Sequence, residues 1–391
     1  MELLVNPSDN KPVIYMIGVA GHPNYGDELI AAAWLRYWAR TRPDAEVWLD
    51  TPRPGQAAVL LDGLHPGLRC VDTLHHACWN GPKGTAAEIL AHGARVVGEP
   101  GLIPREATGV ENLSRVDLVH LVGGGYLNAL WPHHLTLVGA ARAMADRYGT
   151  QTAITGVGLL PLVDDSQQAL GEHLATFDVV DVRDTPSLQA ISSLVPQASN
   201  SGDDSLLGMQ GHVYNRRHSP RTLLCLQSDM LEFPLEELAD YVVRTLQAWK
   251  VDQNRITLVE SMPPNDFAAF QLLQPHLPKL EVMPFSHLWR NGFPISNTQR
   301  WITTRFHPHL LAAAAGSWGL AIPISKDYYT PKHESLAAMH SGWSIVTDLG
   351  DPVAVQPPVA QPFGGRLAEF EAAKTEVAHA VATLTQQRLG R

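Results

Sequence analysis

Short apolar segments of strand type alternate with longer segments of helical periodicity along almost the whole chain of 391 residues. We expect strands in the first half at residues 13–19, 46–49, 118–122, 152–156 and 179–182. Helical patterns lie between or after them at 27–40, 134–148, 167–176 and 185–194. Parallel strands need a crossover connection, which is usually a helix, so this alternation predicts a parallel sheet covered by helices.

The alternation is interrupted once, by the polar segment 208–221, and then resumes. Strands are expected at 223–226, 256–259, 281–283, 301–303 and 320–324, and helices at 235–249, 264–273 and 308–315. A last helix at 366–386 carries an apolar stripe of Leu367, Phe370, Val377, Val381 and Leu384, which is typical of a packing helix. The predicted class is α/β, with two Rossmann-like domains facing across a cleft. We draw the domains at 1–207 and 208–362, followed by the helix in 363–391.

Composition excludes several classes of protein. Hydrophobic residues make up 45% and charged residues 17%, which suits a large core and not a disordered chain. The net charge of -10 and the lack of Lys or Arg clusters argue against a nucleic-acid partner. There is no apolar run long enough for a membrane span, although peripheral membrane contact stays open. With three cysteines and no secretory signal, the expected location is the cytoplasm.

Two glycine-containing turns follow predicted strands. The segment 18–28 contains Asn24, Asp27 and Glu28 and opens a helix whose free N–H groups could face an anion; a plain capped turn is the alternative. The run Gly123–Gly125 comes directly after a buried strand. It favours close approach of a ligand to the backbone, or simply a tight turn.

Cationic residues also stand at strand ends. Arg183, in VDVRDTPSL, could meet an anion in the cleft or form a surface pair with Asp184. In TRFHPH, Arg305 and His307 are two residues apart, so on an extended stretch they would share a side and place an anion-binding fork beside a titratable imidazole. A capping arrangement is the alternative. Lys332 could reach a phosphate or carboxylate from the start of a helix, or be a solvated loop lysine.

Other common chemistries have no anchor in this sequence. The turn at 18–28 is not GxGxxG and lacks the P-loop lysine, and no GxSxG motif is present. The spacing of Cys70, His75, His76 and Cys78 matches no standard zinc pattern. We therefore expect no metal and no bound cofactor.

The motifs PNYGDE, GGG, TGVG, VRD, RFH and a downstream YxxxK occur together in an order that resembles the polysaccharide pyruvyl transferases. The resemblance covers roughly residues 18–336. It implies a fold like that of GT-B glycosyltransferases, and transfer of a pyruvyl group from phosphoenolpyruvate onto two hydroxyls of a sugar as a cyclic ketal. The acceptor would be a cell-surface polysaccharide or a lipid-linked precursor. The first domain would lie on the acceptor side and the second on the donor side.

Carried onto this chain, the resemblance implies roles for particular residues. Arg305 and His307 would be the central catalytic pair, with Arg183 beside them. Donor anions would be bound by Arg183, Arg305, Lys332 and the run Gly123, Gly124 and Gly125. Acceptor-side residues would be Asn24, Asp27, Glu28 and Asn128. His307 is the candidate acid that protonates the methylene carbon.

Two other functions remain open at this point. A glycosyltransferase that uses a nucleotide sugar would have the same fold and would also need Arg and Lys for phosphates. A sugar-binding protein without catalysis could use the same scaffold, although it would have no evident need of the acid.

Overall fold

The computed structural model describes residues 11–209, 213–215, 222–354 and 362–387, and the chain divides into two compact units. Unit 1 consists of Met1–His22, Asp27–Leu207 and Ala372–Arg391, and unit 2 of Pro23–Gly26 and Gly208–Glu371. The boundary after Leu207 is also the one drawn from the sequence. Most of the expected linker at 208–221 lies outside the described residues. The last helix is not a separate part, because its two ends belong to different units.

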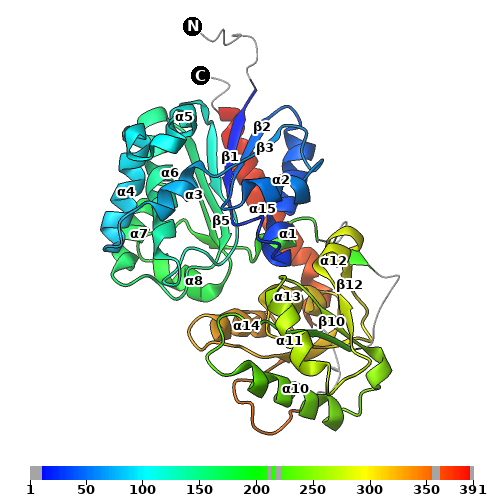
Figure 1. Ribbon diagram of the computed structural model, residues 1–391. Helices are drawn as coiled ribbons and strands as arrows, with labels where there is room; N and C mark the ends of the chain where they lie inside the picture. Colours follow the sequence, from blue (N-terminus) through cyan, green and yellow to red (C-terminus); the bar gives the residue numbers. More distant parts are fainter. Residues whose placement is uncertain (1–10, 210–212, 216–221, 355–361, 388–391) are drawn as a thin grey trace. The chain divides into compact units, whose positions relative to one another are not determined.

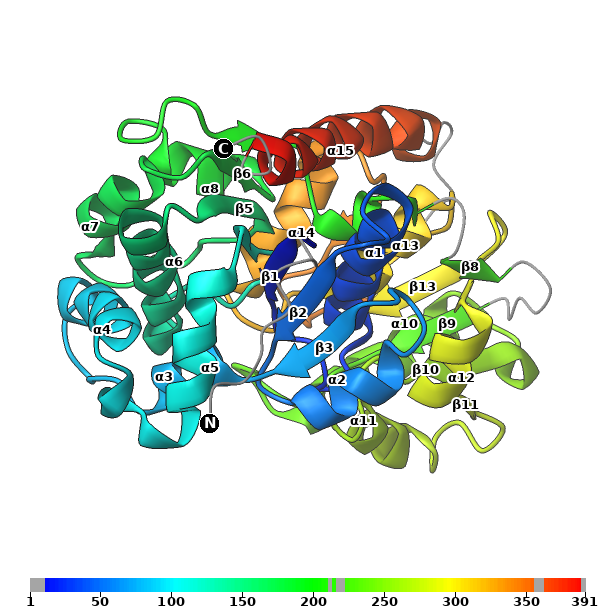
Figure 2. The same ribbon diagram turned by 90° about the horizontal axis from the view of Figure 1, so that it is seen from above.

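Unit 1 is built on a seven-stranded parallel sheet with the order β3-β2-β1-β4-β5-β6-β7. Its first six strands have the doubly wound order of a Rossmann-like fold, in which the order reverses between β1 and β4. Figure 2 shows β1, β2 and β3 side by side. The strands are β1 (Val13–Ile17), β2 (Glu46–Asp50), β3 (Leu68–Val71), β4 (Leu118–Leu121), β5 (Gln151–Val157), β6 (Val179–Val182) and β7 (Ser199–Asn200).

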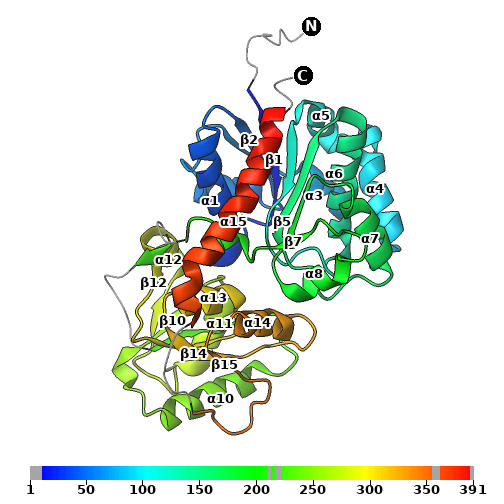
Figure 3. The same ribbon diagram turned by 180° about the vertical axis from the view of Figure 1, so that it is seen from behind.

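Helices cover both faces of this sheet. One face carries α3 (Thr73–Trp79), α4 (Ala86–Gly98), α5 (Ala107–Asn112), α6 (Leu135–Tyr148), α7 (Ser166–Leu174) and α8 (Thr185–Ile191). The other face is covered by α1 (Tyr25–Thr41) and α15 (Pro362–Gln387), as seen in Figures 1 and 3. A further helix, α2 (Pro54–Leu60), follows β2.

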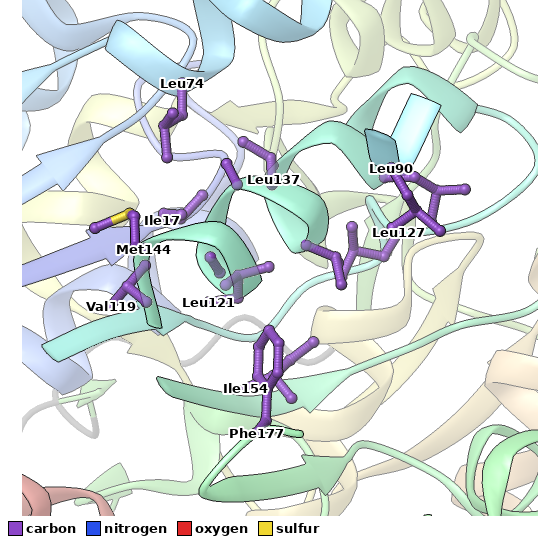
Figure 4. Close-up of a cluster of buried hydrophobic side chains, with 14 of the residues drawn as sticks. Ile17, Leu74, Leu90, Val119, Leu121, Leu127, Leu137, Met144, Ile154 and Phe177 are labelled. Atoms are coloured by element: carbon purple, nitrogen blue, oxygen red, sulfur yellow. The ribbon is translucent and has the colours of Figure 1, made fainter. Parts of the chain in front are cut away.

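The main core of unit 1 lies between the sheet and α6. Leu137 and Met144 of α6 belong to one buried cluster with Val119 and Leu121 of β4 and Ile154 of β5 (Figure 4). All five side chains are fully buried. Strands covered on both faces read as continuous apolar runs, which is why the sequence pattern identified them.

Unit 2 repeats the architecture with a six-stranded parallel sheet in the order β11-β10-β9-β13-β14-β15. The order again reverses at one point, between β9 and β13. The strands are β9 (Thr222–Cys225), β10 (Ile256–Val259), β11 (Glu281–Met283), β13 (Arg300–Thr303), β14 (Trp318–Ala321) and β15 (Ser344–Ile345), with a separate pair of β8 (Tyr214–Asn215) and β12 (Phe293–Pro294). The helices are α10 (Leu235–Ala248), α11 (Asn265–Leu273), α12 (Phe285–Asn291), α13 (Phe306–Ala314) and α14 (Tyr329–Ala338).

Two Rossmann-like α/β units are thus present, as the sequence predicts, and most elements lie within a few residues of their expected positions. The segment between β2 and β4 received no sequence assignment, although it holds β3 and α2 to α5. Helix α13 begins at Phe306, two residues before the expected start. In the described part of the chain, no helix combines the length and apolar character needed to cross a bilayer.

Candidate functional site

The reversal of strand order in unit 2 places two loops side by side at the carboxyl edge of its sheet. The loop after β9 carries Gln227 and Asp229, and the turn after β13 carries Thr304 and Arg305. The two are joined by a hydrogen bond from the Gln227 amide to Thr304 Oγ1 at 2.9 Å. Ligands of open α/β sheets bind at such edges.

Arg305 is buried and paired with a carboxylate that the sequence analysis did not identify. Its Nε and Nη2 donate to Asp266 Oδ1 at 2.7 and 2.5 Å. Asp266 also accepts from the Ser261 and Met262 amides at 2.7 and 2.9 Å. Burial raises the pKa of Asp266, although Arg305 acts against this. Burial alone would lower the pKa of Arg305, but Asp266 outweighs it, so the arginine stays charged.

The guanidinium of Arg305 nevertheless keeps one side for a ligand. Nε and Nη2 face Asp266, which leaves Nη1 on the other side of the fork, and Nη2 also makes a long contact of 3.4 Å with the partly exposed Asp229. The two contacts with Asp266 Oδ1 therefore fix the orientation of the fork, and Nη1 is the nitrogen turned away from this carboxylate. Such preorganisation lowers the cost of binding an anion.

His307 lies against the first turn of α1, so the first and fourth sequence motifs meet in unit 2. A Cβ atom at Gly26, the second residue of α1, would overlap the His307 imidazole at Nδ1, so only glycine fits there beside the ring. The start of the helix is held by the Tyr25 amide, which donates to the Ser261 carbonyl at 2.9 Å. The sequence analysis expected Arg305 and His307 to share one side of an extended stretch, and this expectation is wrong. His307 is the second residue of α13, and a helix turns successive side chains by about 100° per residue.

Lys332 reaches the same edge from α14. Its ammonium lies 3.3 Å from the centre of the Tyr328 ring and 5.0 Å from that of Tyr329. Tyr329 in turn accepts a hydrogen bond from Gln227 Nε2 at 3.0 Å, and Gln227 Nε2 also contacts Asp229. The lysine is mostly buried and is held over aromatic faces, so it is not a solvated loop residue.

A chain of buried side chains lies beneath these residues. His333 Nε2 is 3.2 Å from the Thr304 carbonyl, which can only accept, so this nitrogen carries the proton. His309 Nδ1 then donates to His333 Nδ1 at 3.0 Å, and Ser341 Oγ donates to His309 Nε2 at 3.0 Å. Burial lowers the pKa of His333 to about 4 and that of His309 well below its usual value. Both rings are neutral and connect α14 to the turn that carries Arg305.

In unit 1 the glycine run is held by an internal network. The Gly123 amide donates to Asp204 at 2.9 Å, and Lys374 of α15 donates to Asp204 and Asp181 at 2.9 and 2.8 Å. Gly124 has a φ of 135°, which explains the preference for glycine. Burial alone would lower the pKa of Lys374, but the two carboxylates raise it instead.

The predicted acceptor-side residues are divided between the units. Asn24 belongs to unit 2, whereas Asp27, Glu28 and Asn128 belong to unit 1. Glu28 is fully buried and accepts from the Gly21 amide at 2.6 Å. Asn128 shapes its own loop, because it donates to the Gly125 carbonyl at 2.8 Å and accepts from the Leu130 amide at 3.0 Å. Asp27 is partly exposed and faces the glycine run.

Arg183 directly follows β6 in unit 1, and its side chain is only 5% exposed. Its Nε contacts Asp184 at 3.3 Å, and its guanidinium lies against Gly158, where a Cβ atom would overlap it. Asp184 caps α8 through the Ser187 amide at 2.9 Å. The Arg–Asp pair considered from the sequence is therefore present, but it is buried, and its role toward a donor stays a prediction.

No group of three or more His, Cys, Asp or Glu side chains in the described ranges is arranged to hold a metal ion. His75 pairs instead with Asp50, and Cys78 donates to the Leu74 carbonyl at 3.2 Å. Burial raises the pKa of both Cys70 and Cys78, so neither thiol favours the thiolate form.

Comparison with known families supplies the context for this geometry. The family model of polysaccharide pyruvyl transferases matches residues 24–282, which is more than half of the chain. The chain belongs to the polysaccharide pyruvyl transferase family. The match includes Arg183 and the glycine run and ends before Arg305, His307 and Lys332. No curated protein matches the chain significantly.

Solved structures confirm the fold of this pyruvyl transferase family member. A UDP-glucose: anthocyanidin 3-O-glucosyltransferase in complex with UDP superposes with a TM-score of 0.52 at 11% identity, covering 97% of this chain and 99% of that one. A putative UDP-N-acetylglucosamine 2-epimerase from Listeria monocytogenes gives 0.50 at 12% identity, covering 96% and 91%. At this identity the likeness shows the GT-B fold alone.

Several residues of the site were missed in the sequence. Asp266 and Asp229 belong to no recognisable sequence motif. Each lies at a different distance after its strand, and only the fold brings both of them to Arg305. Lys374 was detectable, since it falls on the apolar stripe of the last helix between Phe370 and Val377. A charged residue in such a stripe indicates a buried partner.

Proposed function

We propose that this protein transfers a pyruvyl group from phosphoenolpyruvate onto two hydroxyls of a sugar, forming a cyclic ketal. The observation that carries the proposal is the grouping of Arg305, His307 and Lys332 at the carboxyl edge of the unit 2 sheet. Phosphoenolpyruvate has a carboxylate and a phosphate, so it needs two cationic partners. Arg305 Nη1 and the Lys332 ammonium supply them, and the N-terminal end of α13 adds a favourable dipole.

The reaction balances with the groups of this chain and no cofactor. His307 donates a proton to the methylene carbon, which becomes a methyl group and leaves an oxocarbenium-like centre. One sugar hydroxyl adds to that carbon, the C–O bond to phosphate breaks with its electron pair, and a second hydroxyl closes the ring. Of the two hydroxyl protons, one leaves with the phosphate and the other restores His307.

The acid role of His307 has a direct test. We expect His307→Gln to keep much of the affinity for phosphoenolpyruvate, because the amide still forms a hydrogen bond. Turnover should fall about 10²–10⁴-fold, the usual contribution of a positioned general acid. Initial rates at saturating donor decide between the roles. Weak donor binding with near-normal turnover would show that His307 only holds phosphate.

The choice between the donor classes rests on binding and product formation. Phosphoenolpyruvate at 100 times its Kd should stabilise the protein by about 2.7 kcal/mol, whereas UDP should not. Wild-type protein incubated with phosphoenolpyruvate and a panel of sugars should release phosphate in step with ketal formation. Stabilisation by UDP and not by phosphoenolpyruvate would instead favour a nucleotide-sugar glycosyltransferase, and binding of sugars without turnover would favour a non-catalytic protein.

A further inference from the structure

A partly exposed carboxylate lies beside the proposed anion-binding arginine, at the carboxyl edge of the unit 2 sheet. Asp229 stands in the loop after β9, and its side chain is 30% exposed. Its Oδ1 lies 3.4 Å from Arg305 Nη2. Asp229 and the three residues that carry the proposed function all belong to unit 2, so this grouping lies within one compact unit.

The Asp229 carboxylate is held in place through one of its two oxygens. Gln227 Nε2 lies 3.3 Å from Asp229 Oδ1 and 3.2 Å from the Asp229 carbonyl. Gln227 itself is fully buried, and the same nitrogen contacts the Tyr329 hydroxyl at 3.0 Å. Arg305 and Gln227 thus both contact Oδ1, which leaves Oδ2 as the oxygen that neither of them engages.

The backbone next to Asp229 is strained. Met230 has a φ of 61°, in the left-handed region that a residue with a long side chain rarely adopts. The loop is fastened shortly after this residue by the Glu232 amide, which donates to the Ile324 carbonyl at 2.9 Å. Such conformations persist where the surrounding structure imposes them, and they cluster at binding and catalytic sites. The strained turn is a second indication that the position of Asp229 serves a function.

The chemistry of the two proposed substrates decides which of them Asp229 can bind. Phosphoenolpyruvate carries a carboxylate and a phosphate, whose negative charges are repelled by a further carboxylate. A sugar presents hydroxyl groups, and a carboxylate accepts hydrogen bonds from a hydroxyl. Asp229 therefore suits the sugar and not the donor. Because it contacts Arg305, a hydroxyl bound to it is held beside the residue proposed to bind the donor.

We propose that Asp229 is the base that receives the proton of the attacking sugar hydroxyl. The hydroxyl oxygen forms the new C–O bond to the ketal carbon with a lone pair, and it keeps the electrons of its O–H bond when the proton moves to Oδ2. The proton then passes to the phosphate oxygen as the C–O bond to phosphate breaks, which restores the carboxylate. The proton of the second hydroxyl restores His307. This inference rests on the proposed function and adds to it the residue that activates the acceptor.

The first test compares Asp229→Asn with Asp327→Asn. Asparagine keeps the shape of the side chain but cannot take up the proton, so turnover with an accepted sugar should fall about 10²–10⁴-fold. The affinity for phosphoenolpyruvate, measured by calorimetry, should be unchanged or up to about fivefold tighter, because a negative charge beside Arg305 is removed. Asp327 is exposed in the loop after β14, at the same edge of the sheet, and Asp327→Asn should leave turnover unchanged.

Two outcomes of this comparison would overturn the proposal. Turnover of Asp229→Asn equal to that of Asp327→Asn would show that no proton passes through Asp229. A parallel loss of donor affinity and turnover would show that Asp229 only holds Arg305 in place.

Formate supplies a readout that a structural role would not change. In Asp229→Ala, sodium formate should restore part of the lost turnover, because its carboxylate takes the place of the missing one. Sodium chloride at the same concentration should not. If formate restores nothing, Asp229 is not the base.

The choice of donor separates this inference from the proposed function. Suppose that the wild-type protein releases no phosphate from phosphoenolpyruvate but transfers glucose from UDP-glucose, and that Asp229→Asn loses this transfer. Pyruvyl transfer is then wrong, and Asp229 remains the base. If Asp229→Asn turns over phosphoenolpyruvate normally, the proposed function stands and the base is wrong. A wild-type protein that uses neither donor with any sugar of the panel overturns both.

Discussion

The two units share one strand order but differ in what they place at the carboxyl edge of the sheet. In unit 2 the edge holds two cations, Arg305 and Lys332, with the partly exposed His307 beside Phe306. In unit 1 the cation Lys374 is turned inward to Asp181 and Asp204, and Arg183 after β6 is buried against Asp184. The same topology therefore carries different charged side chains, in different pairings, at the strand ends of the two units.

This difference shows that one fold can be adapted to different ligands by the side chains at its strand ends. A doubly wound sheet fixes only where the strand ends gather, and the side chains there determine the charge. In the proposed function, the doubly anionic donor is bound at the edge of unit 2. Four substitutions or conditions test the contrast, in decreasing order of expected effect.

The largest effect is expected for Lys374→Met in unit 1. The substitution leaves Asp181 and Asp204 buried without their cation, which should cost about 3–5 kcal/mol of unfolding free energy. Hydrogen exchange of amides in unit 1 measures the loss, and Arg366→Met, at an exposed position of the same helix, should lose less than 1 kcal/mol. If Lys374→Met weakened phosphoenolpyruvate binding without destabilising unit 1, the assignment of this lysine to structure would be wrong.

A smaller but more specific effect is expected for Gly26→Ala in unit 2. Alanine suits the helix, but its Cβ must displace the His307 ring. A displacement of about 1 Å at a catalytic group can cost about 10²-fold in turnover. Gly55→Ala, in α2, is the control, because a Cβ there meets nothing within 4 Å. Normal turnover in Gly26→Ala would mean that the position of His307 does not matter.

Arg305→Lys should separate the two contacts of this arginine. Lysine can still balance Asp266 but cannot offer a second nitrogen to the donor, so phosphoenolpyruvate should bind about 30-fold more weakly, or about 2 kcal/mol. Calorimetric titration measures the change. Arg300→Lys, at the other end of β13 and over Trp318, should bind normally. Unchanged affinity for phosphoenolpyruvate in Arg305→Lys would show that Arg305 does not bind the donor anion with a second nitrogen.

The smallest effect concerns pH and should be alike in both units. Burial lowers the pKa of His120 in unit 1 and of His333 in unit 2 to about 4, against about 6.5 in the unfolded chain. Between these values the unfolded state binds more protons, so stability is full above pH 6.5 and falls as the pH is lowered toward 4. For each of these histidines, the unfolding free energy should fall by about 0.7 kcal/mol between pH 7 and pH 6.

Denaturant unfolding at a series of pH values measures this slope. In His333→Asn, the unfolding free energy of unit 2 should fall less steeply as the pH is lowered, by the contribution of one histidine. The pH dependence of unit 1 should be unchanged. A decline of unchanged steepness would show that His333 titrates normally in the folded protein. Such a result would also contradict the fixed tautomers of the chain from Ser341 to Thr304.

Much of the fold follows from the sequence alone. The buried parallel strands can be identified as apolar runs in the sequence. The polar interruption after residue 207 indicates the boundary between the two units. In the segment between β2 and β4, helices α2, α3 and α5 have only seven, seven and six residues, which are too few turns to show a helical period. Helix α4, with 13 residues, was long enough to be identified and was missed. The capping box of Thr85 and Glu88, present in the structure, was the usable signal for α4.

The site shows the opposite balance. Arg305, His307 and Lys332 were named from their motifs, because a local sequence pattern reports which residue follows a strand. The pairing of Arg305 with Asp266, the identity of the two carboxylates that bind Lys374 and the Asp50–His75 pair were decided only by tertiary structure. The paired residues are 39 positions apart for Arg305 and Asp266, and 25 positions apart for Asp50 and His75. Lys374 is 170 positions from Asp204 and 193 from Asp181. Charge pairing over such separations depends on strand order and burial, which no local pattern encodes.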